Sequence, residues 1–163
     1  MKEMIERLKK KDIPEAISLY QKLAKEQIPS MDMDHECVSE KLFVNVCYVY
    51  KNEKGEIAGL VAFNCDPNYH LAELEFIGSS EKKKGIATNL IRKVAENINK
   101  SEVYEIYAEV SSKDKRAMKF YKSLGFKKHD KESDDTESND EFELYTVKAT
   151  PAEIIKNAKK VEK

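Results

Sequence analysis

The stretch LAELEFIGSSEKKKGIATNLIRKVAEN, residues 71–97, decides the fold of this chain. Its apolar run at 71–77 has the length and composition of a strand, and apolar residues recur at helical spacing after Gly85. A strand joined to a helix in this way directs backbone N–H groups and the positive end of a helix dipole at one place. Three lysines add positive charge there: Lys82, Lys83 and Lys84. The stretch therefore predicts a seat for phosphate groups.

Length and composition predict a single domain at 1–149, because 163 residues suffice for one core. The 29 basic and 30 acidic residues leave a net charge of −1, which gives no general attraction to nucleic acid or to a membrane. Three cysteines outside any paired or metal-ligand spacing favour buried free thiols, and no metal is expected. Since no apolar run resembles a signal peptide or a membrane span, we expect a cytoplasmic protein.

The chain on either side of residues 71–97 predicts an α/β protein. Strands are expected at 4–8, 42–50, 57–63, 71–77, 103–110, from 126, and at 142–148. A first helix is expected after Asp12, its N-cap, and further helices near 34–41, at 86–98 and at 116–124. The right-handed crossover from 71–77 to 103–110 makes one parallel pair in an otherwise antiparallel sheet. Residues 150–163 form a basic amphipathic tail, expected as a loosely packed terminal helix and not as a separate domain.

Two motifs occur in the order found in the GNAT superfamily of acetyl-CoA-dependent N-acetyltransferases, which this chain resembles. The segment KKKGIA, residues 82–87, is similar to the family's Arg/Gln-x-x-Gly-x-Gly/Ala loop. Residues 114–126 are similar to its Asn-x-x-Ala-x-x-x-Tyr-x-x-x-Gly-Phe motif through Asp114, Ala117, Tyr121, Gly125 and Phe126. The resemblance covers residues 4–148. It implies a GNAT-like fold: a central, mostly antiparallel sheet of six or seven strands with one splayed parallel pair, and helices on both faces.

The first motif also has a physical explanation, because a pyrophosphate approaches backbone N–H groups closely only where side chains are as small as Gly85 and Ala87. Taken alone, the stretch could equally be a lysine-rich helix entry with solvated side chains. The resemblance implies that acetyl-CoA, or CoA, is held by Phe76, Ile77, Lys82, Lys83, Lys84, Gly85, Ile86, Ala87, Thr88, Asp114, Ala117 and Tyr121. Asp114 replaces the family's Asn, and its carboxylate would repel phosphates. Its contact with the cofactor is therefore left open, whereas a helix-capping role is expected.

Acetyl transfer from a thioester to an amine needs a base for the ammonium, donors for the oxyanion and an acid for the thiolate. The resemblance implies Glu73 as the base, acting directly or through a water, and Tyr121 as the acid. It also implies backbone N–H groups near 76–78 as the oxyanion donors. Glu75, on the same face as Glu73, and His70 are alternative bases. An exposed carboxylate and a core aromatic are the structural alternatives for Glu73 and Tyr121.

Acidic residues crowd the segment 130–141, which the resemblance places beside the acceptor. Such a segment either concentrates cations or is a solvated, partly disordered loop. The function expected is therefore N-acetylation of a primary amine on a small cationic molecule, such as a polyamine or an aminoglycoside-like compound. A peptide or protein N-acetyltransferase and a catalytically idle acyl-CoA-binding module are the alternatives. The expected partner is the small amine or peptide acceptor, without nucleic acid or membrane, and a homodimer is left open.

Overall fold

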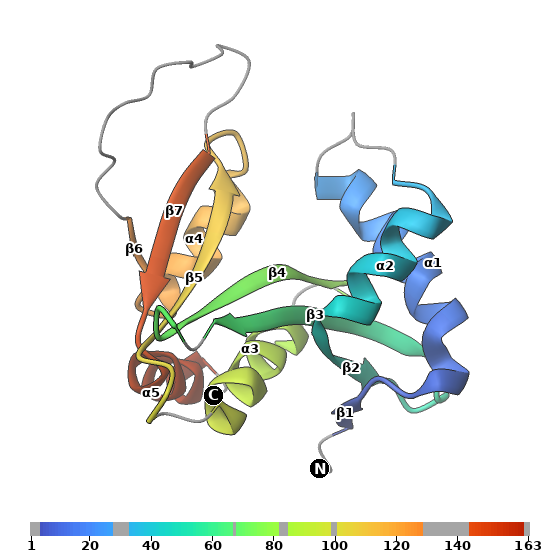
Figure 1. Cartoon of the computed structure of the whole chain (residues 1–163), viewed down its shortest axis with the longest axis horizontal. Helices are drawn as coiled ribbons and strands as arrows, with labels where there is room; N and C mark the ends of the chain where they lie inside the picture. Colours follow the sequence, from blue (N-terminus) through green and yellow to red (C-terminus); the bar gives the residue numbers. More distant parts are fainter. Residues whose placement is uncertain are drawn as a thin grey trace. The chain divides into compact units, whose positions relative to one another are not determined.

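The computed structural model of the chain describes residues 4–27, 33–66, 68–81, 85–98, 101–128 and 144–161, the side chains of 159–161 excepted (Figure 1). Its strands are β1 (Ile5–Arg7), β2 (Val46–Lys51), β3 (Ile57–Asp66), β4 (Leu71–Ser79), β5 (Glu105–Ser111), β6 (Lys127–Lys128) and β7 (Leu144–Ala149). Its helices are α1 (Ile13–Gln27), α2 (His35–Val44), α3 (Ile86–Asn97), α4 (Lys115–Ser123) and α5 (Pro151–Val161), with a 3-10 turn, η1 (Lys10–Asp12), before α1.

The strands form one mixed sheet in the order β1-β2-β3-β4-β5-β7-β6. Strand β4 runs parallel to β5, whereas β1, β2, β3, β5, β6 and β7 have antiparallel neighbours, so the predicted α/β class and parallel pair are confirmed. The parallel register joins Leu71–Glu73 to Glu105–Tyr107, and no further pair between these two strands is found in the part of the chain described. Both strands continue beyond this short ladder.

The chain divides into two compact units. The first contains residues 1–64 and 75–97, and the second contains residues 65–74 and 98–163. Strand β4 begins in the second unit and ends in the first. The sequence-based boundary at residue 149 stays a prediction.

The core of the first unit lies on both sides of β3, because helices cover both faces. Leu60 and Ala62 belong to a buried cluster with residues of α1 and α2. Gly59, which points the other way by the strand's two-residue period, meets α3. Strand β3 therefore reads as a continuous apolar run, as expected for a strand buried on two sides.

The second unit has one buried and one open sheet face. On β5, Ile106, Ala108 and Val110 are buried, whereas Glu105 and Tyr107 are half-buried and Glu109 is exposed. Strand β7 pairs with β5 from Ile106↔Ala149 to Ser111↔Leu144 and continues this alternation. Figure 1 shows α4 behind β5 and β7.

Helix α5 is an integral part of the second unit, so the expectation of a loosely packed terminal helix is wrong. Thr150 and Glu153 cap it reciprocally: Glu153 N donates to Thr150 Oγ1 at 3.1 Å, and Thr150 N donates to Glu153 Oε1 at 3.0 Å. Ile154 and Ala158 are fully buried. Asn157 Nδ2 donates to the carbonyl of Leu124 at 3.3 Å, which joins α5 to the end of α4.

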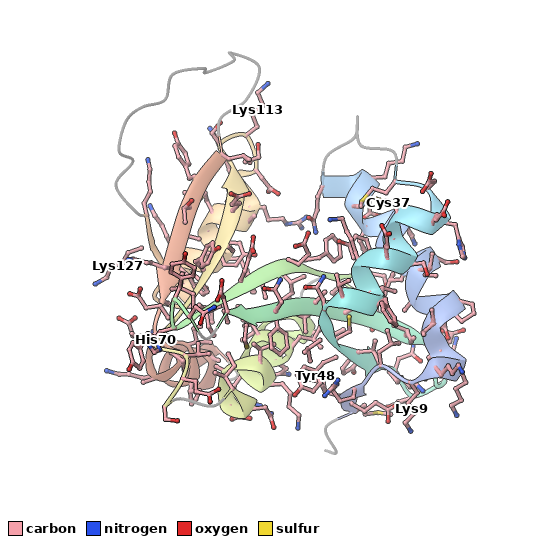
Figure 2. The ribbon with its side chains drawn as sticks, in the orientation of Figure 1. Lys9, Cys37, Tyr48, His70, Lys113 and Lys127 are labelled. Atoms are coloured by element: carbon pink, nitrogen blue, oxygen red, sulfur yellow. The ribbon has the colours of Figure 1, made fainter. Side chains whose placement is uncertain are left out.

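Two further expectations need correction. The strand expected at 42–50 begins at Val46, because α2 continues to Val44 and Asn45 Nδ2 bonds the carbonyl of Lys41 at its end. Of the three free cysteines only Cys47 is buried; Cys65 and Cys37 (Figure 2) are exposed. The acidic segment 130–141 and His129 lie outside the described residues.

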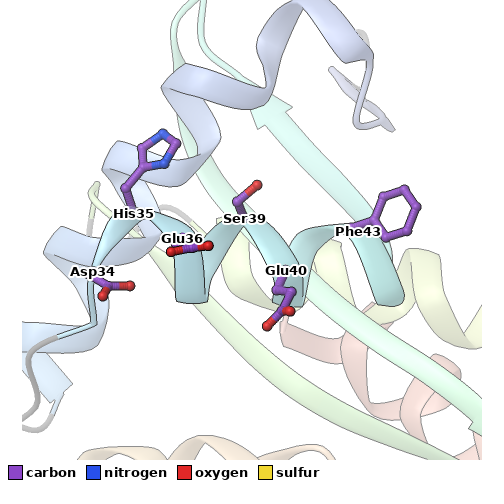
Figure 3. Close-up of a pocket in the computed structure, with 6 residues that line it drawn as sticks. All are labelled: Asp34, His35, Glu36, Ser39, Glu40 and Phe43. Atoms are coloured by element: carbon purple, nitrogen blue, oxygen red, sulfur yellow. The ribbon is translucent and has the colours of Figure 1, made fainter.

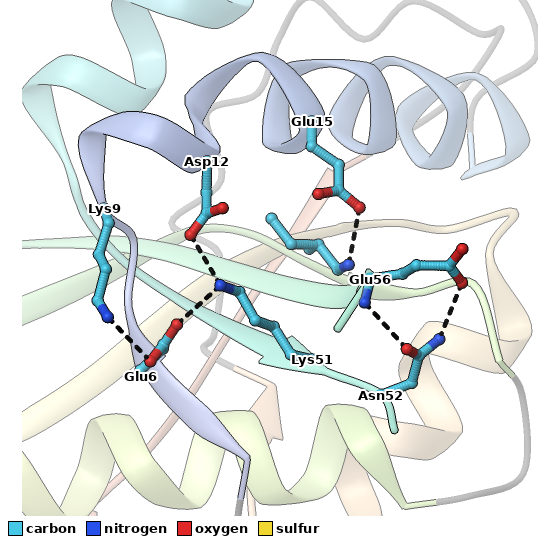
Figure 4. A network of polar contacts seen from close by, with 8 residues as sticks. Glu6, Lys9, Asp12, Glu15, Lys51, Asn52 and Glu56 are labelled. Atoms are coloured by element: carbon cyan, nitrogen blue, oxygen red, sulfur yellow. Dashed lines mark hydrogen bonds and ion pairs between the residues drawn. The ribbon is translucent and has the colours of Figure 1, made fainter. Parts of the chain in front are cut away.

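A polar network fixes the edge of the first unit (Figure 4). Lys51 Nζ on β2 lies 2.9 Å from Asp12 Oδ2 and 3.1 Å from Glu6 Oε2. The hydrogen bond from Lys51 lowers the pKa of each carboxyl. Asp12, expected to cap the first helix, instead lies in η1 with its carboxylate on Lys51. The network therefore ties β1 and η1 to β2.

Candidate active site

The predicted phosphate loop ends in a glycine that its conformation requires. Gly85 has φ +71°, and an added Cβ would meet no atom within 4 Å, so backbone conformation and not lack of space selects glycine. Its carbonyl accepts from Asn89 N at 3.0 Å and so begins α3. In this helix start, Ile86 and Thr88 are buried and Ala87 is half-buried. Lys82, Lys83 and Lys84 lie outside the described residues.

Close packing fixes the start of α3 in the first unit. A Cβ at Gly59 would lie 2.6 Å from Ile86 Cγ2 and 3.2 Å from Leu90 Cδ1, so β3 permits this contact only with glycine. Before the loop, Ser80 N donates to the carbonyl of Ala58 at 2.8 Å. The turn is therefore anchored to β3 on both sides of the lysines.

The start of α3 is polar and has no negative charge of its own. Its first turn contains no acidic residue, so the positive end of the dipole is not neutralised there. Asn89 Oδ1 is buried and has no hydrogen-bond partner within the described residues. A helix start with a left-handed glycine before it and no acidic residue in its first turn fits an anionic ligand such as the pyrophosphate of CoA.

The two predicted cofactor residues on β4 are held by α1. Phe76 stacks on Tyr20 with ring centroids 4.1 Å apart, and Gln27 Nε2 donates to the carbonyl of Ile77 at 3.1 Å. A Cβ at Gly78 would lie 3.0 Å from Leu23 Cδ1. Glycine at this position therefore permits the close approach of α1. The backbone that would polarise a thioester carbonyl is thus rigidly supported.

Glu75 and Glu73, the two candidate bases, have different surroundings. Glu75 Oε2 accepts from Lys41 Nζ of α2 at 3.0 Å, and its charge, together with burial as the larger cause, raises the pKa of Tyr20. Glu73 is half-buried in the second unit and is the register partner of Tyr107 on β5. The ion pair with Lys41 engages the Glu75 carboxylate, which disfavours Glu75 as a base.

Tyr107 and Glu109 share the open face with Glu73 and were missed in the sequence. Burial and then the charges of Glu73 and Glu109 raise the pKa of Tyr107. Polar and apolar residues alternate along β5 with a period of two, and this alternation also places Tyr107 and Glu109 on the face opposite the buried residues.

His70 has a structural role. It has φ +57°, its ring stacks on Tyr104 with centroids 4.5 Å apart, and its Nδ1 lies 3.1 Å from the carbonyl of Glu102 (Figure 2). These contacts fix the turn before β4.

Tyr121 is a buried phenol at the centre of an aromatic group. Its ring makes edge contacts with Phe126 at 5.0 Å and Phe120 at 5.3 Å between centroids. Burial, and then the charge of Asp114, raises the pKa of the Tyr121 hydroxyl above its usual value. The phenol is therefore protonated at neutral pH and can donate a hydrogen bond to a ligand.

Asp114 caps α4, as expected from the sequence. Its Oδ1 accepts from Ala117 N at 3.0 Å, which uses the carboxylate for the helix itself. The two residues place the start of α4, and with it Tyr121 two turns later.

A shallow hollow over α2 contains none of the predicted site residues (Figure 3). Half of its lining residues are acidic, and one is an exposed aromatic: Asp34, His35, Glu36, Ser39, Glu40 and Phe43. Asp34 is also the cap of α2, since its Oδ1 accepts from Cys37 N at 2.8 Å.

Solved structures of two N-acetyltransferases and of one further protein share this fold. The ribosomal-protein-S18-alanine N-acetyltransferase of Escherichia coli is 15% identical, with 91% of this chain and 94% of that chain covered and a TM-score of 0.71. The PaiA N-acetyltransferase of Thermoplasma acidophilum, in complex with coenzyme A, is 14% identical, with 92% and 99% covered and a TM-score of 0.72. The protein smu.2055 of Streptococcus mutans is 22% identical, with 93% and 99% covered and a TM-score of 0.72.

The acetyltransferase (GNAT) domain model matches residues 8–139. The chain therefore belongs to the GNAT acetyltransferase family, and the resemblance seen in its motifs is confirmed. Among curated proteins, none matches the sequence. In the part of the chain that the structure describes, no helix is long and apolar enough to cross a bilayer.

Proposed function

We propose that this chain is an acetyl-CoA-dependent N-acetyltransferase that acts on a primary amine in the cytoplasm. The observation that carries the proposal is the start of α3: Gly85 in the left-handed conformation, followed by a helix without acidic residues in its first turn, in a chain of the GNAT family. Acetyl-CoA, when bound, supplies a thioester whose carbonyl carbon is the electrophile. The neighbour solved with coenzyme A supports this choice of cofactor.

Glu73 is the proposed base. An alkylammonium has a pKa of about 10.4 and is inert as a nucleophile until it loses a proton. The Glu73 carboxylate accepts that proton, directly or through one water. The neutral nitrogen then attacks the carbonyl carbon, and backbone N–H groups near Phe76 and Ile77 stabilise the oxyanion.

Tyr121 is the proposed donor to the leaving sulfur. Its pKa, raised by burial and by Asp114, lies above the roughly 8.5 of a cysteine-like thiol. Full proton transfer from the phenol to the thiolate is therefore uphill, and the hydroxyl stabilises the developing thiolate as a hydrogen-bond donor. When the C–S bond breaks, the proton lost by the new amide nitrogen would pass to the thiolate sulfur, so that CoA would leave as the thiol.

The acceptor proposed is a small cationic amine. Glu109 shares the open face of the second unit with the proposed base Glu73 and adds negative charge there, which favours a positively charged substrate. A peptide amino terminus is the second candidate, supported by the neighbour described as a ribosomal-protein-S18-alanine N-acetyltransferase. Neither nucleic acid nor a membrane is needed for either acceptor, and a homodimer is compatible with both.

Calorimetry with acetyl-CoA and free-thiol release with an amine panel test the proposal. The panel contains spermidine, an aminoglycoside, and a short peptide with a free amino terminus. We expect acetyl-CoA binding and turnover on at least one amine. Binding without turnover on any member would contradict the enzyme assignment and favour an idle acyl-CoA-binding module.

A further inference from the structure

The open face of the second unit contains one aromatic ring beside the proposed base. Tyr107 on β5 is the direct register partner of Glu73 on β4, and both side chains are half-buried. Their chain neighbours Ala72, Ile106 and Ala108 are buried on the opposite face. Directly paired residues on one sheet face lie within side-chain contact range, so ring and carboxylate are adjacent.

Acidic groups surround this ring. Three carboxylates act on Tyr107 electrostatically, in the order Glu73, Glu109 and Asp66, after the larger effect of burial. On the other side, β7 pairs Lys148 with Tyr107. Lys148 Nζ, however, lies 3.4 Å from Glu105 Oε1, so this ammonium is neutralised by another residue. Lys127 on β6 pairs with Lys148 one strand further away.

We propose that Tyr107 is a specificity-determining residue for the acceptor, with its ring face binding the positively charged amine beside Glu73. This proposal rests on the proposed function. A ring face attracts a cation within about 6 Å, and the adjacent carboxylates strengthen the preference for charge. The same ammonium lies next to the group that deprotonates it. Tyr107 thus selects amines that arrive protonated over amines that are neutral at pH 7.

Substitutions at Tyr107 separate the ring from the hydroxyl. Tyr107→Leu removes the ring, and we expect the KM for spermidine to rise roughly 2- to 30-fold, the range of a cation–π contact. The KM for aniline, which is neutral at pH 7, and the KM for acetyl-CoA should not change. Tyr107→Phe keeps the ring and should stay within about twofold of the wild type. An equal loss in both variants, or no loss in Tyr107→Leu, overturns the proposal.

A binding measurement makes the result independent of turnover. Tetramethylammonium is a cation without an N–H group and cannot be acetylated. In protein labelled with fluorotyrosine, the Tyr107 resonance, assigned by its loss in Tyr107→Phe, should shift saturably with this cation. The resonance of exposed Tyr69, in the same unit, is the internal control and should not.

The kinetic comparison and the binding measurement together distinguish the role of Tyr107 from the proposed function. A saturable shift at Tyr107 without turnover of any amine refutes the proposed function and leaves the cation-binding ring supported. Amine turnover without a shift, and with an unchanged KM in Tyr107→Leu, refutes the role of Tyr107 and leaves the proposed function intact.

Discussion

Replacing Tyr121 by phenylalanine removes one hydroxyl and keeps the ring. The ring and its edge contacts with Phe120 and Phe126 are retained, so stability should change by no more than about 1 kcal/mol. A hydrogen bond to a charged group contributes about 1.5–3 kcal/mol. If the hydroxyl donates to the developing thiolate, kcat should therefore fall roughly 10- to 150-fold.

The assay is free-thiol release at saturating acetyl-CoA and acceptor, with acetyl-CoA affinity measured separately by calorimetry. Affinity should stay within about twofold of the wild type, because the hydrogen bond forms only in the transition state. The raised pKa of Tyr121 also predicts that wild-type kcat persists up to about pH 10, the usual tyrosine value, before any loss from phenol ionisation. A Tyr121→Phe variant with the wild-type kcat would refute the donor role.

Three other substitutions test the phosphate loop, the last helix and the polar edge. Gly85→Ala and its control Gly55→Ala place alanine at φ +71° and +79° in open surroundings, so each should cost about 1–2 kcal/mol of stability. Only Gly85→Ala should weaken acetyl-CoA binding in calorimetry. Equal acetyl-CoA affinities of the two variants would contradict the phosphate seat. Ile154→Ala should destabilise the protein by about 2–5 kcal/mol in urea unfolding, because the side chain is fully buried. A loss of stability no larger than that of the surface control Lys156→Ala would mean that α5 does not pack into the core of the second unit. Asp12→Asn should lower stability at neutral pH and make no difference in acid. The pKa of Asp12 is lowered in the folded protein, so its ionised carboxylate stabilises the fold at pH values above the usual aspartate pKa of about 4, and this stabilisation is lost as the pH falls through the lowered pKa. A difference that persists in acid would exclude the ion pair with Lys51 as its cause.

Local pattern was sufficient for elements whose periodicity, caps and turns agree. Asp114 caps α4 as expected, and Gly85 adopts the left-handed backbone at the turn into α3. The end of α2 was missed because Phe43 and Val44 favour strands by composition. In the structure they are exposed residues at the end of a helix.

Long-range contacts could not be predicted. The docking of α5 depends on Asn157 reaching the carbonyl of Leu124, two residues 33 positions apart in the sequence. The lysines of this segment suggested a loose tail, whereas Ile154 is fully buried. Similarly, Gly78 permits the approach of Leu23, a contact that only the fold reveals.

The candidate site could be predicted only where its residues belong to a local motif. Gly85, Tyr121 and Asp114 belong to motifs of fixed spacing, so sequence could single them out. The pairing of Glu73 with Tyr107 depends on the parallel register of β4 and β5, which no local pattern specifies. The ion pair that occupies Glu75 likewise depends on Lys41 of α2.

Acetyl transfer itself is the most direct test of the central claim. Purified protein, acetyl-CoA and spermidine are incubated at neutral pH, and thiol release and the mass of the amine are measured together. The account predicts equal amounts of free CoA and acetylated amine, with both abolished when either substrate is omitted. Acetyl-CoA that binds but is never consumed, with spermidine or with any other amine of the panel, would contradict it.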